Sequence, residues 1–369
     1  MKALLIAPDL FGPPGGIARY TQMVCQVLLN AGYTVKAMVL ADSPNAAVPA
    51  TFNQPTFNYH PCQGNRVVFV QKCIEAALKM KPALILVGHV NFSPLGYGLA
   101  QLFGAKWATF IYGIDAWHPL PLLRRLAVQQ CDQIISISQF TAARAGQANG
   151  LPRQKIRILH NCISSEFVLD GKGQEQANNG RLSLLTVARM TLAEQYKGHD
   201  YVIRAIPILL RRFPNLVYNI VGDGDWQPAL MQLVNELGIS RHVIFHGRVS
   251  DKQLLQHYTD ASLFIMPSQK EGFGFVFIEA MALGVPAVGG NTDAAPEVIV
   301  NGKTGYVVNP TSVEEIVTAV SKLLENPQLR QQMGAAAQQH VAQNFGFERF
   351  QQDLLAYLGE LQPEEPALA

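Results

Sequence analysis

The chain has 369 residues, of which 49% are apolar and 15% charged, so it is neither disordered nor fibrous and can form two globular domains. Its net charge of +2 is too small to indicate a nucleic-acid-binding protein. The five cysteines are scattered and never spaced as C-x-x-C, which predicts the reduced thiols of a cytoplasmic protein rather than a zinc site or a disulfide framework. No apolar segment reaches the ~18 residues that a membrane-spanning helix needs, so we expect no transmembrane segment.

The first half of the chain repeats a short apolar strand, a loop and a helix. We expect its strands at 2–7, 34–40, 83–88, 106–111 and 133–137, with helices between them, as at 17–31 and 70–80. Continuous apolar runs are typical of strands buried on both faces of a parallel sheet. The loop after the first strand ends in Gly15 and Gly16 and has the bare backbone of a loop that contacts phosphate or substrate. It does not match G-x-G-x-x-G, so a dinucleotide site is not predicted.

The same pattern restarts after a polar stretch at 169–181, which is rich in Gly and Asn and predicts a linker or surface loop. Strands are expected at 182–188, 216–221, 243–246, 262–266, 286–288 and 305–308. Helices are expected at 199–212, 226–237, 251–260, 275–283 and 312–325, and a last helix at about 347–361. The chain is therefore predicted to be an α/β protein with two doubly wound parallel-sheet domains.

The stretch 268–286 has the most informative sequence. Its helix is apolar on every face except at Glu279, and a buried carboxylate is costly unless a neighbour hydrogen-bonds to it. Glu271 lies in the preceding loop, where glycines let a ligand approach the backbone and the amides around Gly274 to Val276 form an anion site. The two carboxylates suit sugar or ribose hydroxyls, although an ordinary buried helix with a satisfied Glu fits the sequence equally well.

Further candidate residues follow the other predicted strands of the second half, at the edge where open parallel sheets bind ligands. They are Arg189, Lys197, Gly222 and Arg248. Cations and amides suit a diphosphate, and carboxylates suit a ribose diol and a sugar, so we expect one crevice that binds a nucleotide-diphosphate sugar.

Asp223-Gly224-Asp225 could hold Mg²⁺ or Mn²⁺ on such a diphosphate. It lies in a glycine-rich turn, however, where Asp and Gly are favoured for backbone reasons. We therefore expect no metal there, because the nearby cations can do the same work.

In the first half, Asp115 and His89 follow predicted strands. Asp115 is the functional candidate, whereas we expect His89 to be a structural hydrogen-bonding residue. The segment 120–126 is short, basic and apolar; it could contact a membrane surface, but a helix on the domain surface is the favoured interpretation.

Glu271 and Glu279 form an E-x7-E arrangement, and other short motifs stand in order around it. They are Gly15-Gly16, Ser136-Ile137-Ser138, His160-Asn161, Arg189, the segment 194–200, Gly222-Asp223-Gly224, Phe245-His246-Gly247, Pro267-Ser268, the segment 271–274, the segment 279–286 and Pro296-Glu297. With this ordered set the chain resembles a retaining GT-B glycosyltransferase of glycosyltransferase family 4, the glycosyl transferases group 1, over nearly its whole length.

The resemblance implies two Rossmann-like domains that face a central cleft. Residues 1–168, joined by the C-terminal helix 347–369, would bind the acceptor, and residues 181–346 would bind the donor. It also implies a metal-independent transfer of a hexose, with retained anomeric configuration, to a hydroxyl of a glycan, lipid or small metabolite. The acceptor would attack from the front face while the leaving diphosphate helps to take the proton, and no cofactor would be needed.

Specific residues acquire roles through the resemblance. The catalytic group would comprise Arg189 and Lys197 on the diphosphate, Glu271 on the transferred sugar, and Asp115. The donor-binding group would comprise Gly15, Gly16, Gly222, Arg248, Phe273, Gly274, Phe275, Val276 and Glu279, the last holding the ribose hydroxyls. The chain departs from the family at Tyr112, where many members have His, and at Cys162, where many have Gly.

Two alternatives stay open. A non-hydrolysing nucleotide-sugar epimerase would need acid/base carboxylates and a catalytic histidine that we cannot place here. A non-catalytic nucleotide-sugar-binding subunit is disfavoured because Arg189, Lys197, Glu271 and Glu279 are all retained. The base and sugar of the donor, for example UDP-glucose or GDP-mannose, and the acceptor are not predicted. The expected location is cytoplasmic, and peripheral contact with the inner face of a membrane is compatible with the sequence.

Overall fold

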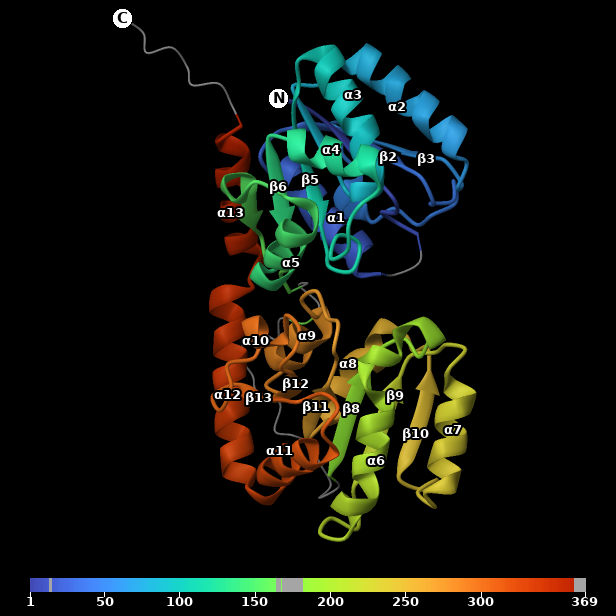
Figure 1. Ribbon diagram of the computed structural model, residues 1–369, viewed down its shortest axis with the longest axis vertical. Helices are drawn as coiled ribbons and strands as arrows, with labels where there is room; N and C mark the ends of the chain where they lie inside the picture. Colours follow the sequence, from blue (N-terminus) through green and yellow to red (C-terminus); the bar gives the residue numbers. More distant parts are fainter. Residues whose placement is uncertain (13–14, 164–166, 168–181, 362–369) are drawn as a thin grey trace, which may run out of the picture. The chain divides into compact units, whose positions relative to one another are not determined.

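The computed structural model describes residues 1–12, 15–163, 167 and 182–361, which form two compact units (Figure 1). The first unit comprises Met1–Asn161 and Phe347–Ala369, and the second comprises Cys162–Gly346. The predicted first domain extended to 168 and the predicted second domain began at 181. The predicted linker at 169–181 lies outside the described residues.

The first unit contains a seven-stranded parallel sheet of order β3-β2-β1-β4-β5-β6-β7. Its strands are β1 (Lys2–Ala7), β2 (Thr34–Val39), β3 (Phe57–Pro61), β4 (Leu84–Val87), β5 (Lys106–Ile111), β6 (Gln133–Ser136) and β7 (Ile156–Ile158). Its helices are α1 (Gly16–Asn30), α2 (Arg66–Met80), α3 (Ser93–Phe103), α4 (Leu122–Gln130), α5 (Gln139–Asn149) and α13 (Phe347–Gly359). The last helix, α13, packs on α1, so the end of the chain completes the first unit, as the family resemblance implied.

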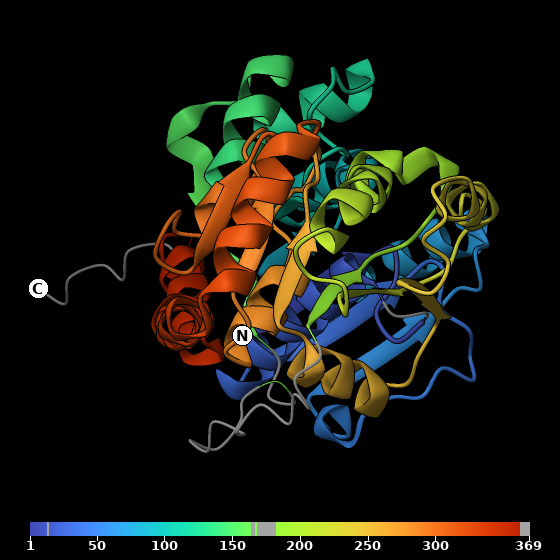
Figure 2. The same ribbon diagram turned by 90° about the horizontal axis from the view of Figure 1, so that it is seen from below.

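The second unit contains a six-stranded parallel sheet of order β10-β9-β8-β11-β12-β13. Its strands are β8 (Ser183–Val187), β9 (Val217–Val221), β10 (Val243–Gly247), β11 (Leu263–Met266), β12 (Ala287–Gly290) and β13 (Gly305–Val308). Its helices are α6 (His199–Leu210), α7 (Gln227–Glu236), α8 (Asp251–Asp260), α9 (Phe275–Ala282), α10 (Ala295–Val298), α11 (Val313–Glu325) and α12 (Pro327–Asn344). Helix α6 packs on α7 and α11, while α9 packs on α8 and α12, so helices cover both faces of the sheet (Figure 2).

All eleven predicted strands are present, with ends within two residues of those expected. The prediction was wrong at the start of α2, which begins at Arg66 rather than residue 70. Asn65 causes the earlier start, because its side chain accepts the backbone N–H groups of Val67 and Val68 and caps the helix. The predicted surface helix near 120–126 is confirmed as α4. Among the described residues, none of the helices is both long and apolar enough to cross a membrane.

Candidate functional site

In the second unit, four neighbouring strands end beside candidate site residues, three of which were predicted. Arg189 follows β8, Gly222 follows β9, and Glu271 follows β11. Asp293, which follows β12, was not among the predicted residues. Since all four strands are parallel, these four residues follow the same edge of the sheet.

Lys197 and Glu271 form the central pair of this edge. The Lys197 ammonium lies 2.5 Å from Glu271 Oε2, and each side chain is only 16% exposed. Burial disfavours the cation, but the charge and hydrogen bond of Glu271 outweigh it, so the pKa of Lys197 is raised. The Gln269 N–H also donates to the Tyr196 carbonyl at 2.9 Å, which joins the loop of Lys197 to the loop of Glu271. The site therefore presents a fixed, charged ammonium.

Asp293 holds the backbone of Glu271 in place. Its carboxyl oxygens accept the N–H of Glu271 at 2.8 Å and the N–H of Ala295 at 3.0 Å. Asp293 is only 4% exposed, and burial, followed by smaller effects that include the charge of Glu271, raises its pKa to about 7. The signal that could have identified it was an acidic residue just after the predicted strand 286–288.

The raised pKa of Asp293 predicts a pH dependence of stability. The folded pKa of about 7 lies above the ordinary value of 3.8, so the stability it contributes is present at acid pH and is lost as pH rises through 7. Between pH 5 and pH 8 the free energy of unfolding should fall by about 3 kcal/mol more in the wild type than in Asp293→Asn. Urea unfolding of both proteins at the two pH values measures this difference, and parallel pH profiles would contradict it.

Arg189 lies in a more open part of the same edge. Its side chain is 72% exposed and pairs with Glu194 Oε1 at 2.7 Å. The Tyr196 hydroxyl donates to the same oxygen at 3.4 Å, and the Tyr196 ring centre lies 5.7 Å from the Lys197 ammonium. Glu194, which sequence reasoning had not selected, therefore links Arg189 to the tyrosine whose ring lies beside Lys197.

The two aspartates of the Asp-x-Asp segment have different partners. Asp223 Oδ2 lies 2.8 Å from Arg248 Nε, and Asp225 Oδ1 accepts the Leu192 N–H at 2.7 Å. Gly222 has a φ of +132°, and a Cβ there would lie 2.1 Å from the Ala188 carbonyl oxygen. Only glycine fits this close approach of two chain segments, so Gly222 has a structural reason to be present.

Glu279 is buried inside the second unit and has a neutral partner. It is 2% exposed, and its Oε2 accepts the hydroxyl of Tyr258 on α8 at 2.7 Å. The cost of burying this carboxylate is thereby reduced. Tyr258 was not predicted, because a contact between residues 21 positions apart leaves no local pattern.

The start of α9 is the predicted anion site. Gly274 precedes the helix with a φ of +93°, and among the described residues no side chain caps this N-terminus. Phe275 and Val276 are half-buried there. The Phe273 side chain is fully buried and packs edge-on against Phe345 at 5.4 Å, so it belongs to the core and does not face a ligand.

The remaining candidates lie in the first unit. Asp115 accepts the Tyr112 N–H at 3.1 Å, and burial raises its pKa to about 7. Gly15 and Gly16 are exposed at the start of α1, which no side chain of the described residues caps. The structural role expected for His89 is confirmed, because its Nδ1 accepts the Asn91 N–H at 3.1 Å.

Tyr112, which replaces the usual histidine, packs its ring edge-on against Tyr20 at 5.5 Å. The neighbouring His89 ring cannot supply an imidazolium near neutral pH, since burial lowers its pKa to about 4.

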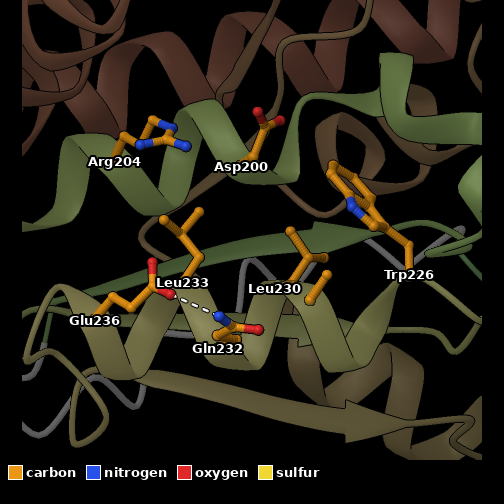
Figure 3. Close-up of a pocket in the computed structure, with 8 residues that line it drawn as sticks. Asp200, Arg204, Trp226, Leu230, Gln232, Leu233 and Glu236 are labelled. Atoms are coloured by element: carbon orange, nitrogen blue, oxygen red, sulfur yellow. Dashed lines mark hydrogen bonds between the residues drawn. The ribbon is translucent and has the colours of Figure 1, made fainter.

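A cavity of about 270 Å³ lies between α6 and α7 (Figure 3). It is lined by Asp200, Arg204, Trp226, Ala229, Leu230, Gln232, Leu233 and Glu236. None of the predicted donor residues lines this cavity, and Gln232 and Glu236 hydrogen-bond to each other at 2.7 Å. We do not assign it to the donor.

Two family models match consecutive parts of the chain. The model described as Glycosyltransferase Family 4 matches residues 14–167, and the model described as Glycosyl transferases group 1 matches residues 171–340. The chain belongs to glycosyltransferase family 4. The predicted family is thereby confirmed.

Curated relatives of this family 4 chain include two mannosyltransferases. A GDP-mannose-dependent alpha-(1-6)-phosphatidylinositol monomannoside mannosyltransferase of Mycolicibacterium smegmatis is 32% identical over 243 residues, which cover 62% of this chain and 63% of the relative. A GDP-mannose-dependent monoacylated alpha-(1-6)-phosphatidylinositol monomannoside mannosyltransferase of Corynebacterium glutamicum is 33% identical, over 63% of this chain and 64% of the relative. The chain therefore matches less than two thirds of the length of either relative.

Solved structures show the fold of this family 4 member. HepE of Anabaena in complex with UDP has a TM-score of 0.78 at 19% identity and covers 98% of this chain and 100% of its own. Sucrose-phosphate synthase of Thermosynechococcus elongatus has a TM-score of 0.81 at 19% identity and covers 98% of both chains. The predicted GT-B fold of two parallel-sheet α/β domains is confirmed.

Proposed function

We propose that this chain is a retaining glycosyltransferase that moves a hexose from a nucleotide-diphosphate sugar to a hydroxyl acceptor without a metal ion. The mannosyltransferase relatives are named for GDP-mannose, and HepE was solved with UDP, so both bind the class of molecule that we propose as donor or product here. The single observation that carries the proposal is the Lys197–Glu271 pair at 2.5 Å, at the ligand-binding edge of the sheet.

Each residue then has a chemical task. The acceptor hydroxyl oxygen forms a bond to the anomeric carbon while the bond from that carbon to the diphosphate oxygen breaks. The hydroxyl proton passes to the departing phosphate oxygen, and a nucleoside diphosphate leaves. Negative charge grows on the diphosphate during this step, and Lys197, Arg189 and the start of α9 stabilise it. Glu271 fixes the ammonium and accepts sugar hydroxyls, while Glu279 accepts the ribose hydroxyls.

No divalent ion is needed in this scheme because the side chains supply the positive charge. Asp223 and Asp225 favour this scheme, since one oxygen of each carboxylate already accepts a hydrogen bond, from Arg248 and from the Leu192 N–H respectively. Treatment with a chelator should leave turnover unchanged, whereas strict dependence on added Mg²⁺ or Mn²⁺ would contradict the metal-independent part of the proposal.

The proposal is tested first by a thermal-shift screen with UDP, GDP and ADP. A nucleotide that binds only the folded state should stabilise it by ~2.7 kcal/mol when its concentration is 100 times its Kd. The stabilising base then selects the set of nucleotide sugars to be assayed, each with and without hydroxyl acceptors. Transfer that depends on the acceptor and yields a product with the donor's anomeric configuration supports the proposal, and NMR of the anomeric proton reports that configuration.

The same assay separates the two alternatives. Conversion of the sugar nucleotide without any acceptor would identify an epimerase. Tight nucleotide binding without turnover of any donor would instead favour a non-catalytic binding subunit.

A further inference from the structure

Three consecutive helices of the first unit carry an unusual share of exposed apolar side chains. Sixteen large apolar residues are exposed among the described residues, and eight of them lie on α2, α3 and α4. They are Val67, Val70, Ile74 and Leu78 on α2, Leu102 on α3, and Leu122, Leu123 and Leu126 on α4. Helix α2 packs on α3 and α3 packs on α4, so the three helices form one layer (Figure 1).

On α2 the exposed residues form a line. Val67, Val70, Ile74 and Leu78 are spaced by three, four and four positions, which places them on one side of a helix. The buried residues of α2, such as Phe69 and Cys73, face the core from a different side. The helix therefore has a second apolar face that the unit itself does not cover.

On α4 the solvent-facing side is apolar rather than polar. Leu122 and Leu126 are one turn apart, and Leu123, the most exposed of the three at 73%, lies beside them. Ala127 and Val128 are the buried residues of this helix, and Val128 lies on the side opposite the three leucines. Single exposed leucines are common, whereas a cluster of exposed apolar residues is typical of a surface that binds a protein, a membrane or a ligand.

The charges on the same helices indicate that this surface suits an anionic partner. The three helices contain five basic residues, Arg66, Lys72, Lys79, Arg124 and Arg125, and a single acidic residue, Glu75. Glu75 is already paired with Lys72 at 2.9 Å. Since the whole chain has a net charge of only +2, this layer is locally basic and the rest of the chain is net acidic.

We propose that the layer α2–α3–α4 docks on the surface of an anionic membrane. The exposed Leu, Val and Ile side chains would enter the boundary between head groups and acyl chains, and the Arg and Lys side chains would bind the head groups. Pairing with a second copy through the same face is disfavoured because it would bring basic residues against basic residues.

The proposal is tested by flotation of the full chain with vesicles, without donor or acceptor, so that its outcome is independent of the proposed transfer reaction. The protein should float with phosphatidylglycerol vesicles and not with phosphatidylcholine vesicles, and binding should weaken as salt is raised. The triple variant Leu122→Ser, Leu123→Ser, Leu126→Ser should weaken binding by at least about tenfold. The pair Arg124→Gln, Arg125→Gln should weaken it as well and reduce its salt dependence.

A matched control is available in the second unit. Ile208, Met231 and Ile244 are also exposed apolar residues, and the triple serine variant at these positions should bind vesicles like the wild type. Circular dichroism and Tm confirm that each variant is folded. The proposal is overturned if the wild type does not float, if the α4 variants float as the wild type does, or if the α4 leucines are needed for a dimer and not for vesicle binding.

Discussion

Replacing Lys197 with methionine should lower kcat by about 10²- to 10³-fold, the loss seen when one preorganised group that stabilises developing negative charge is removed. The ammonium is held at 2.5 Å from Glu271 and is only 16% exposed, so it is fixed in position before the substrate binds. A fixed charge stabilises the departing diphosphate without reorganisation at the moment of reaction. Methionine keeps the length and apolar stem of the side chain, so the change mainly removes the charge. Single-turnover rates with saturating donor measure the effect.

Lys270 offers a matched control for this experiment. Its ammonium lies 5.7 Å from the Tyr196 ring centre, the same distance as that of Lys197, but it is Lys197 that pairs with Glu271. Lys270→Met should therefore retain a rate close to that of the wild type. If Lys197→Met turns over like the wild type, or loses no more activity than Lys270→Met, the role given to Lys197 is wrong.

The strands were predictable because a buried strand has a recognisable local sequence pattern. A strand buried on both faces is an unbroken apolar run, such as Leu263–Met266, and the sequence shows it directly. Strand β3 was missed because its residues are only partly buried at the edge of the sheet and include Asn58 and His60. Strand β7 was missed because three residues are too few to form a pattern.

Helix α12 shows a different limit of sequence reasoning. It contains few large apolar residues, and part of its packing depends on close approach of the backbone. A Cβ at Gly334 would lie 2.1 Å from the carbonyl oxygen of Gly284, which follows α9. A helix that packs through glycine and alanine has no strong apolar periodicity, so it was not predicted.

The sequence was sufficient to select residues of the candidate site, but not to predict which groups they hydrogen-bond. The rule that ligands bind at the carboxyl ends of parallel strands was sufficient to select Arg189, Lys197 and Glu271. Asp293 and Tyr258 were missed because their importance depends on which backbone N–H or carboxylate they reach in the folded chain. Phe273 was selected for its backbone amide, and its side chain belongs to the core.

The second large effect is expected at Glu279, where a ribose-binding role and a purely structural role predict different results. If Glu279 accepts the ribose hydroxyls, Glu279→Ala should raise the Kd for the nucleoside diphosphate by about 10- to 100-fold, the value of one or two hydrogen bonds to a charged group. The Kd for inorganic pyrophosphate, which has no ribose, should stay unchanged. Titration calorimetry with both ligands gives the ratio of the two constants, which is insensitive to a general loss of stability.

Tyr258→Phe completes this comparison, because it removes the hydroxyl that donates to Glu279 at 2.7 Å and keeps the carboxylate. The buried carboxylate loses a hydrogen bond, so the free energy of unfolding should fall by about 1.5 to 3 kcal/mol while the carboxylate stays available to a ribose. We therefore expect Tyr258→Phe to lower the Tm with little change in the ratio of the two dissociation constants, and Glu279→Ala to change that ratio. If Glu279→Ala also lowers the Tm but leaves the ratio unchanged, then Glu279 serves the core of the second unit through Tyr258, and the ribose must be held by other groups at the sheet edge.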